Sequence, residues 1–197
     1  MLSQRFGSLL LPAVVILLSI LATLWVDAWQ WSYAEIIDGQ SWRLVTGHFT
    51  HGNLWHLLWN GLAFVLLTGF ASPSMRKYFG GAAFLGLCLW VGVAIFWWLP
   101  TVGIYRGLSG VLHGWAVLCI VSSVGWAWRF KTALLILLGL KLGWDFLAPT
   151  AMPVYLGGLN GAVLPAAHAF GALGGVVMAG GGTLFSYLRQ KRLRGIR

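Results

Sequence analysis

The stretch YRGLSGVLHG, residues 105–114, opens a long apolar segment that carries a serine and a histidine, each followed by a glycine. This segment is one of six that are long enough, with some tilt, to cross the roughly 30 Å apolar core of a bilayer. The six are expected at Ser8–Val26, Leu54–Ala71, Phe79–Leu99, Leu108–Gly125, Thr132–Ala148 and Leu164–Leu188. The sequence therefore predicts an all-α polytopic membrane protein with six transmembrane helices.

The composition supports a membrane protein and excludes several other classes. Of the 197 residues, 59% are hydrophobic and 9% are charged, whereas about a quarter are charged in ordinary soluble domains. The mean hydropathy is +0.81, so the chain has too little polar surface for a water-soluble globule. Two cysteines are too few for a secreted disulfide scaffold. We expect a single domain over residues 1–197, with a short cytoplasmic N-terminus and a basic tail at residues 189–197.

The basic residues predict how the chain is oriented. With six spans both termini lie on one side, and that side holds ten of the thirteen basic residues. They are Arg5, Arg76, Lys77, Arg129, Lys131, Arg189, Lys191, Arg192, Arg194 and Arg197. Cytoplasmic loops carry the excess of Lys and Arg, so both termini are expected in the cytoplasm and the protein in a bacterial inner membrane. The net charge of +9 then reflects topology and attraction to anionic lipids. No nucleic-acid partner is expected, because no basic face is interleaved with exposed aromatic residues.

Polar residues inside the apolar segments are the candidates for function, because a polar side chain in a bilayer is costly. They are His56, Asn60, Ser109, His113, Lys141, Asp145 and His168. The second, fourth and sixth segments all begin at the outer face. Four of the candidates lie in the first turns of these segments: His56, Asn60, Ser109 and His168. The topology therefore predicts that these four side chains share a similar depth, just below the outer surface.

A serine and a histidine at one depth indicate nucleophilic acyl chemistry. Ser109 needs an adjacent base to become a nucleophile, and the imidazole of His168 can accept the proton and later return it to the leaving amine. The side chains of His56 and Asn60, with the backbone N–H of Ser109, can stabilise the oxyanion. No acidic third member is evident, because Asp145 belongs to another segment, and a two-residue Ser–His dyad is the simplest interpretation.

Glycines supply the close packing that such a dyad requires. Ser109 lies between Gly107 and Gly110, which are candidate supporting residues for the site. Small residues at four-residue spacing let membrane helices approach closely. Two such steps occur, one in the fourth segment and one in the sixth, at Gly110–Gly114 and Gly171–Gly175.

Four short motifs, in order along Trp42–Gly175, resemble those of the rhomboid intramembrane serine proteases. They are Trp-Arg at 42–43, His-x-x-x-Asn at 56–60, Gly-x-Ser-Gly at 107–110 and Ala-His-x-x-Gly at 167–171. The resemblance covers most of the chain and implies a six-helix rhomboid-like bundle without a cofactor. It also implies site roles, with Ser109 as nucleophile, His168 as base, and His56 and Asn60 as oxyanion donors.

One departure from the family pattern points to a subfamily. Rhomboids commonly place Tyr one turn after the serine, where it packs on the catalytic His, and here that position is His113. Residues 105–114 resemble the rhombosortase branch. That resemblance implies substrates with a C-terminal Gly-Gly motif, a transmembrane helix and a basic tail.

Each candidate residue also has a purely structural interpretation. Ser109 can be a helix-packing serine, and His56 and Asn60 can form hydrogen bonds between helices. His113 can be a satisfied core histidine, or it can orient His168.

The remaining polar residues leave further alternatives open. Lys141 and Asp145, at i, i+4 spacing, are expected to form an intramembrane ion pair, and the sharper alternative is that Asp145 recognises a substrate group. A metal site at His48, His51 and His56 is not expected, because no cysteine or carboxylate joins them at ligand spacing.

The sequence therefore predicts an endopeptidase that cleaves single-pass transmembrane proteins near the outer, periplasmic face of the lipid bilayer. The first rival is a rhomboid protease of general specificity. The second is a non-catalytic rhomboid-like protein that binds membrane clients, although such proteins typically lack the serine or the histidine. A small transporter is a third, and it would be expected to show inverted repeats and polar residues at the midplane.

Overall fold

The computed structural model describes residues 2–73, 75, 80–148 and 164–194, and most of them are helical. Each of the six expected segments forms one long helix. These are α1 (Leu2–Leu24), α5 (Leu54–Phe70), α6 (Gly80–Trp98), α7 (Ser109–Ser122), α8 (Trp128–Leu147) and α10 (Pro165–Arg194). The all-α prediction is confirmed. Of the basic residues used to orient the chain, Arg76, Lys77 and Arg197 lie outside the described residues.

The number of membrane spans is a separate question from the number of helices. Within the described part of the chain, α6 alone is both long enough and apolar enough to cross a bilayer by itself. Three further apolar helical stretches are shorter: Leu10–Leu24, Leu54–Phe70 and Ser109–Ser122. The six-span count therefore stays a prediction.

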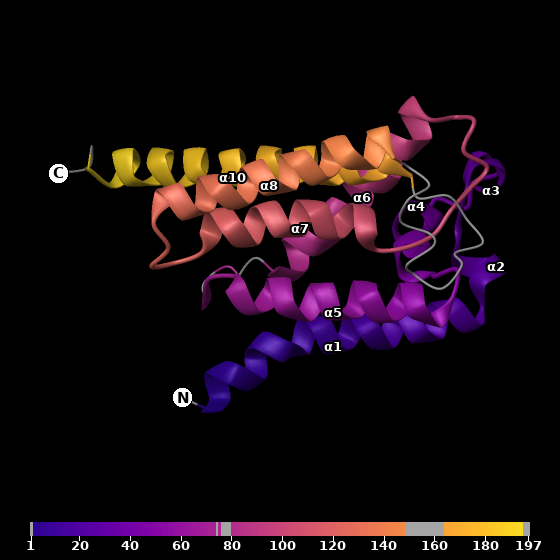
Figure 1. The fold of residues 1–197 in the computed structure, drawn as a ribbon, viewed down its shortest axis with the longest axis horizontal. Helices are drawn as coiled ribbons and strands as arrows, with labels where there is room; N and C mark the ends of the chain where they lie inside the picture. The colour runs from indigo at the N-terminus through magenta and orange to yellow at the C-terminus, as the bar shows by residue number, and fades with distance from the viewer. Residues whose placement is uncertain (1, 74, 76–79, 149–163, 195–197) are drawn as a thin grey trace.

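The long helices run side by side, and the two ends of the bundle differ (Figure 1). Both chain termini lie at one end. Short elements cover the other end: α2 (Val26–Trp29), β1 (Trp31–Ser32), α3 (Tyr33–Ile37), α4 (Arg43–Thr46), η1 (Gly47–Phe49) and β2 (Ile104–Tyr105). Strands β1 and β2 pair antiparallel, with Trp31 opposite Tyr105. This pairing ties the segment after α1 to the approach of α7.

A buried arginine holds the short elements together. Arg43 is 4% exposed, and its Nη1 donates to the backbone carbonyls of Asp27 and Gln30 at 2.9 and 2.8 Å. Its Nε donates to Oε1 of Gln40 at 2.8 Å. A buried guanidinium is tolerated because its donors are satisfied, so the Trp-Arg motif has a structural role at this end of the bundle.

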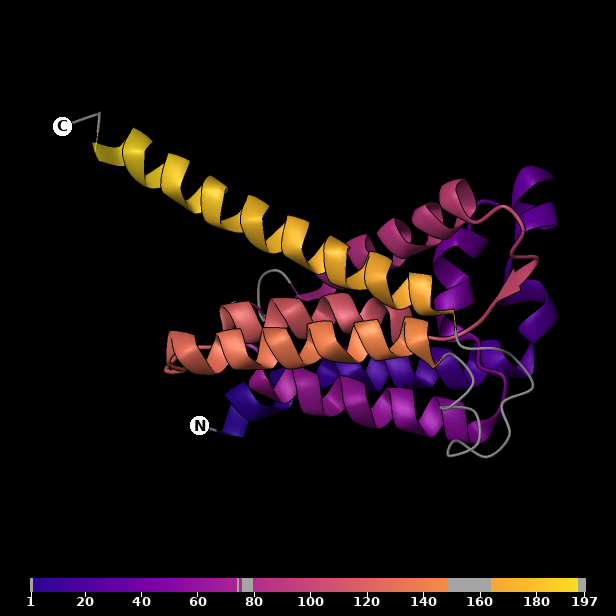
Figure 2. The same cartoon turned by 45° about the horizontal axis from the view of Figure 1, so that its top comes forward.

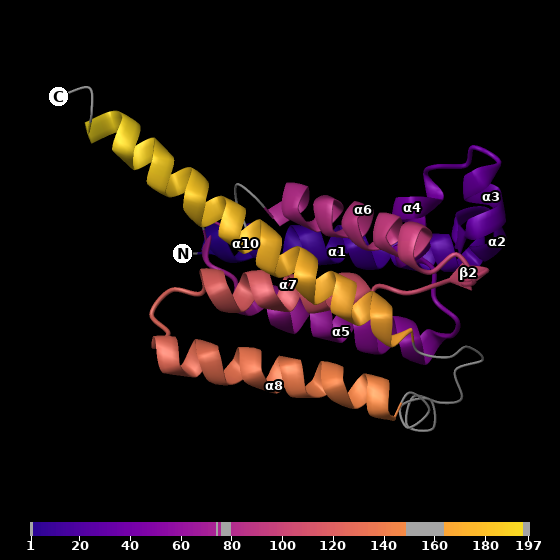
Figure 3. The ribbon, with the colours of Figure 1, turned by 90° about the horizontal axis from the view of Figure 1, so that it is seen from above.

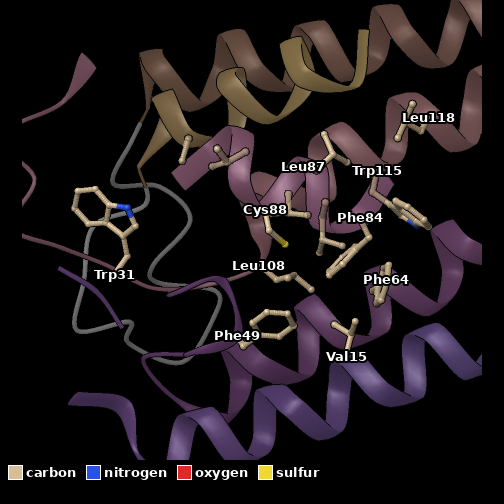
Figure 4. Close-up of a cluster of buried hydrophobic side chains, with 14 of the residues drawn as sticks. Val15, Trp31, Phe49, Phe64, Phe84, Leu87, Cys88, Leu108, Trp115 and Leu118 are labelled. Carbon is tan, nitrogen blue, oxygen red and sulfur yellow. The ribbon is translucent and has the colours of Figure 1, made fainter. Parts of the chain in front are cut away.

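An aromatic cluster fixes the centre of the bundle (Figure 4). Phe64 of α5, Phe84 of α6 and Trp115 of α7 contact one another, with ring centroids 5.0 to 5.8 Å apart. The indole N–H of Trp115 donates to Oγ1 of Thr68 at 3.0 Å. These contacts fix α7 against α5 and α6, and Ser109 stands at the N-terminal end of that fixed helix.

Helix α10 crosses α7 obliquely and packs on it closely (Figures 2 and 3). A Cβ placed on Gly171 would collide with the carbonyl oxygen of Gly110, and one on Gly114 would collide with the carbonyl of Gly171. The predicted close approach of the glycine steps is therefore confirmed. Helix α8 lies at the edge of the bundle beside α7 and α10 (Figure 3), and Asp145 is its buried residue.

Candidate active site

Ser109 and His168 meet where the N-terminal ends of α7 and α10 come together. Oγ of Ser109 lies 2.9 Å from Nε2 of His168, although 59 positions separate them in the sequence. His168 is 5% exposed. The short distance follows from the glycine contacts one turn further along both helices, which leave no side chains between the two backbones. The structure thus brings together the two residues that the sequence predicts as nucleophile and base.

A third residue joins them that the two-residue interpretation left out. Oδ2 of Asp145 lies 2.7 Å from Nδ1 of His168, and the Asp145 side chain is 2% exposed. Asp145 belongs to α8, which packs beside both α7 and α10. The sequence explained it as the partner of Lys141, four residues away. The site is therefore a hydrogen-bonded series of Ser109, His168 and Asp145. The Asp145 carboxylate is buried against His168 and Lys141. A role in substrate recognition would require it to be exposed.

Lys141 contacts the same carboxylate. Its Nζ lies 2.6 Å from Oδ2 of Asp145, which confirms the predicted i, i+4 ion pair. The same Nζ lies 2.8 Å from Nε2 of His113 and 3.3 Å from Nδ1 of His168. One ammonium therefore contacts three side chains from three helices.

His113 contacts both the nucleophile and the base. Its Nδ1 lies 2.7 Å from the carbonyl oxygen of Ser109, and its ring stacks on that of His168 with centroids 4.2 Å apart and planes 18° apart. Both ring nitrogens of His113 have partners, as in a satisfied core histidine, and its ring also covers the face of His168, so both interpretations of His113 stay open.

With both histidine rings neutral, the donors and acceptors of this cluster allow one consistent assignment of protons. A lysine ammonium only donates, so Nε2 of His113 must accept from Lys141 and its Nδ1–H must donate to the Ser109 carbonyl. A carboxylate only accepts, so Nδ1–H of His168 donates to Asp145. Nε2 of His168 is then unprotonated and accepts from the Ser109 hydroxyl. This is the tautomer that a general base requires.

The two predicted oxyanion donors lie on α5, one turn apart. The ring of His56 packs against Gly107, which has φ of +114°, and a Cβ at residue 107 would come within 2.5 Å of Cε1 of His56. Gly107 therefore meets two demands that only glycine satisfies, a positive φ and the absence of a side chain. Asn60 is 7% exposed, and among the described residues its Nδ2 has no hydrogen-bond partner. An unpaired buried amide N–H is costly, so this donor is available to a ligand.

His51 packs edge-on against His56, with ring centroids 4.9 Å apart. It lies between η1 and α5, and its Nδ1 contacts the carbonyl oxygen of Phe49 at 3.1 Å. Burial, with the nearby His56 as a smaller cause, lowers the pKa of His51 to about 3. His51 is therefore neutral at physiological pH and supports the ring of His56 without adding charge.

One group of side chains has the ligand types of a metal site. Across the described ranges, ligand atoms of His113, Asp145 and His168 lie within 4.8 Å of one another. The Lys141 ammonium contacts an atom of each, so the cation at this position is supplied by the chain.

Comparison with known families agrees with the motifs. The rhomboid domain family matches residues 38–183, a range that holds every residue of the candidate site. No curated protein and no solved structure matches the chain. Rhomboid proteins are embedded in membranes, and the family is generally one of intramembrane serine proteases that act on transmembrane substrates. Since the match covers most of its length, the chain belongs to the rhomboid family.

Proposed function

We propose that this protein is an intramembrane serine endopeptidase in which Ser109 is the nucleophile, His168 the general base and Asp145 the residue that orients the base. The observation that carries the proposal is the continuous chain from Ser109 Oγ to His168 Nε2, at 2.9 Å, and from His168 Nδ1 to Asp145, at 2.7 Å. Nucleophile and base are recognised by this mutual geometry, with a third group holding the base.

The reaction proceeds in two halves. Ser109 Oγ attacks the scissile carbonyl while Nε2 of His168 takes the hydroxyl proton, and the imidazolium then gives that proton to the leaving amine as the peptide bond breaks. Water next attacks the acyl-enzyme ester, again losing a proton to His168, and the serine hydroxyl is regenerated as the new carboxylate leaves. Asp145 stabilises the transient imidazolium in both halves and is not itself protonated.

The oxyanion is stabilised by donors from two helices. We assign this role to the Asn60 amide, the His56 ring and the backbone N–H of Ser109, which begins α7 and has no partner within that helix. Among the residues that the structure describes, Nδ2 of Asn60 has no partner. This supports the assignment, because a donor that gives up no other hydrogen bond needs no reorganisation to bind the oxyanion.

The substrate class follows from the position of the site. Ser109 is the first residue of α7, and α7 begins at the end of the bundle covered by the short elements, opposite the end that holds both termini (Figure 1). With the termini in the cytoplasm of a bacterial inner-membrane protein, the site opens toward the periplasm and meets the outer end of a transmembrane substrate. A helical substrate must unwind locally before its carbonyl is reachable, and glycines ease that unwinding. We therefore favour rhombosortase-type processing of proteins with a C-terminal Gly-Gly motif, a transmembrane helix and a basic tail.

Two alternatives remain to be separated from this function. A rhomboid protease of general specificity would have the same active site and would differ only in the substrate sequences that it cleaves. A client-binding protein without catalysis would have no need for a hydrogen-bonded serine, histidine and aspartate.

The test uses purified protein and two transmembrane substrates that differ only in a Gly-Gly to Leu-Leu replacement above the helix. Wild type is expected to cleave the Gly-Gly substrate and to react with a fluorophosphonate. Ser109→Ala is expected to lose both activities, while Ser122→Ala, a serine that contacts the Cys119 carbonyl at the other end of α7, retains them. Equal cleavage of both substrates would favour general specificity. Cleavage by a folded Ser109→Ala variant would exclude Ser109 as nucleophile.

A further inference from the structure

We infer that Lys141 is a positioning residue of the active site: its ammonium joins Asp145 to His113 and so holds the catalytic histidine from two sides. The inference rests on the proposed function and extends it to two residues that the protease mechanism does not otherwise require. Lys141 touches no reacting atom, so its effect passes through the side chains that it contacts.

The first contact sets the direction of the Asp145 carboxylate. Nζ of Lys141 and Nδ1 of His168 share the same oxygen, Oδ2, at 2.6 and 2.7 Å. The Asp145 side chain is 2% exposed, whereas that of Lys141 is 33% exposed. A carboxylate that is buried without a compensating charge is strongly unfavourable. Lys141 therefore allows Asp145 to remain ionised beside His168.

The second contact passes through His113 to the nucleophile. Lys141 Nζ donates to Nε2 of His113 at 2.8 Å, which leaves the proton of that ring on Nδ1. Nδ1–H then donates to the carbonyl of Ser109 at 2.7 Å. A neutral His113 with the other tautomer would direct an unprotonated Nδ1 at that carbonyl and lose the bond. Lys141 thus fixes the tautomer of His113 as well as the position of Asp145.

The two branches converge on the ring of His168. Asp145 holds its edge through Nδ1, and His113 covers its face at a centroid separation of 4.2 Å. The third Lys141 contact is between Nζ and Nδ1 of His168, 3.3 Å apart. Both atoms are donors in this assignment, so they lie close together but form no hydrogen bond. Rotation of the His168 ring would break contacts on both sides, so the ring is held in the orientation that accepts from Ser109.

The first test separates catalysis from binding. Lys141→Met keeps an unbranched side chain, one atom shorter, and removes the charge. This variant is expected to lower kcat up to about 100-fold with KM nearly unchanged, because misplaced catalytic groups can cost that much in rate. Lys141→Arg, which restores a cation, is expected to recover part of the rate. Lys131→Met is the matched control, since Lys131 lies on the same helix and its Nζ donates to the carbonyls of Val121 and Ser123, away from the active site.

The outcomes distinguish failure of this inference from failure of the proposed function. Wild-type kcat in Lys141→Met, in a protein whose wild type cleaves substrate, would overturn the positioning role and leave the protease intact. A parallel fall in the Lys131→Met control would also overturn it. Absence of cleavage and of fluorophosphonate labelling in wild type would instead reject the proposed function.

A second test does not depend on activity. It asks whether the three side chains that contact the Lys141 ammonium converge on one position. Removal of the side chain in Lys141→Ala leaves Nε2 of His113, Oδ2 of Asp145 and Nδ1 of His168 facing one space, and two histidines with a carboxylate are a common zinc ligand set. Purified Lys141→Ala is expected to bind one Zn²⁺ per chain, measured by elemental analysis after dialysis against zinc chloride. Wild type and Lys141→Ala/His113→Ala are expected to bind none. A folded Lys141→Ala variant that binds no zinc would show that the three groups do not converge on the ammonium.

Discussion

At the scale of single residues, the orientation of His168 depends on which atom faces its Nδ1. In Asp145→Asn one atom must still accept from both Nζ of Lys141 and Nδ1 of His168. The amide oxygen therefore takes that position and the proton of His168 stays on Nδ1, but the negative charge that stabilises the imidazolium is lost. We expect kcat to fall by about 10²-fold or more, since a positioned general base contributes about 10²–10⁴-fold. The measurement is cleavage by purified protein at fixed substrate.

The control for Asp145→Asn must show that the same change away from the site leaves cleavage intact, and thermal unfolding must show that both variants fold. Asp27→Asn is a suitable comparison, because Asp27 lies in α2 among the short elements and its side chain accepts from Gln30 at 3.3 Å. Its activity is expected to equal that of wild type. If Asp145→Asn kept more than about a tenth of wild-type kcat, the site would operate as the two-residue dyad that the sequence suggested.

The residue scale is also where sequence reasoning was most incomplete. Ser109 and His168 were recognisable because each is a polar residue in an apolar segment near the same face. Asp145 met the same two conditions, near the outer end of its segment, but its i, i+4 partner Lys141 gave it a sufficient local explanation. The depth of Asp145 in the membrane could have assigned it to the site. The fifth segment runs outward, so Asp145, near its end, lies at the same depth as Ser109.

At the scale of helices, the α7–α10 contact sets the distance between nucleophile and base. Gly171→Leu would place a side chain against the carbonyl of Gly110, so the helices must separate and Ser109 must move away from His168. We expect loss of fluorophosphonate labelling and a free energy of unfolding that is lower by about 1–3 kcal/mol, as for other overpacked interiors. Thermal unfolding in detergent and labelling rates measure the two effects.

The same helix provides the control. Gly181 also lies in α10, but a Cβ there would meet nothing within 4 Å, so Gly181→Leu is expected to leave both unfolding and labelling unchanged. Equal damage from the two substitutions would mean that a large side chain disturbs α10 wherever it is placed, and that the contact of Gly171 with α7 does not set the position of Ser109.

The sequence predicted the long helices better than the connections between them. The fifth segment was placed from Thr132 because Arg129 and Lys131 interrupt the apolar pattern, whereas α8 begins at Trp128. Lys131 belongs there because its Nζ donates to the carbonyls of Val121 and Ser123 at the end of α7. The short elements between α1 and α5 were not predicted, since tertiary hydrogen bonds such as those of Arg43 hold them.

At the scale of the whole molecule, the fold and the charge distribution give independent arguments for topology. The fold places both termini at one end of the bundle and the beginning of α7, which is Ser109, toward the other (Figure 1). The basic residues are concentrated at the end that holds the termini, and the acidic Asp27, Glu35 and Asp38 lie among the short elements at the opposite end. The charge distribution predicts a compartment for each end, and in the proposed orientation the active site lies at the periplasmic end.

Cysteine labelling in intact cells tests this assignment. Cys88 and Cys119 are buried, so a thiol introduced at an exposed position is expected to dominate the reaction with a membrane-impermeant maleimide. Gly52 is exposed beside α5 at the end that carries the short elements, and Val124, 77% exposed, lies between α7 and α8 at the end that holds the termini. Gly52→Cys should be labelled in spheroplasts, and Val124→Cys only after the membrane is permeabilised, because an excess of positive charge keeps its loop in the cytoplasm. The reverse pattern would place Ser109 at the cytoplasmic face, and the proposed cleavage at the outer end of a transmembrane substrate would then be impossible.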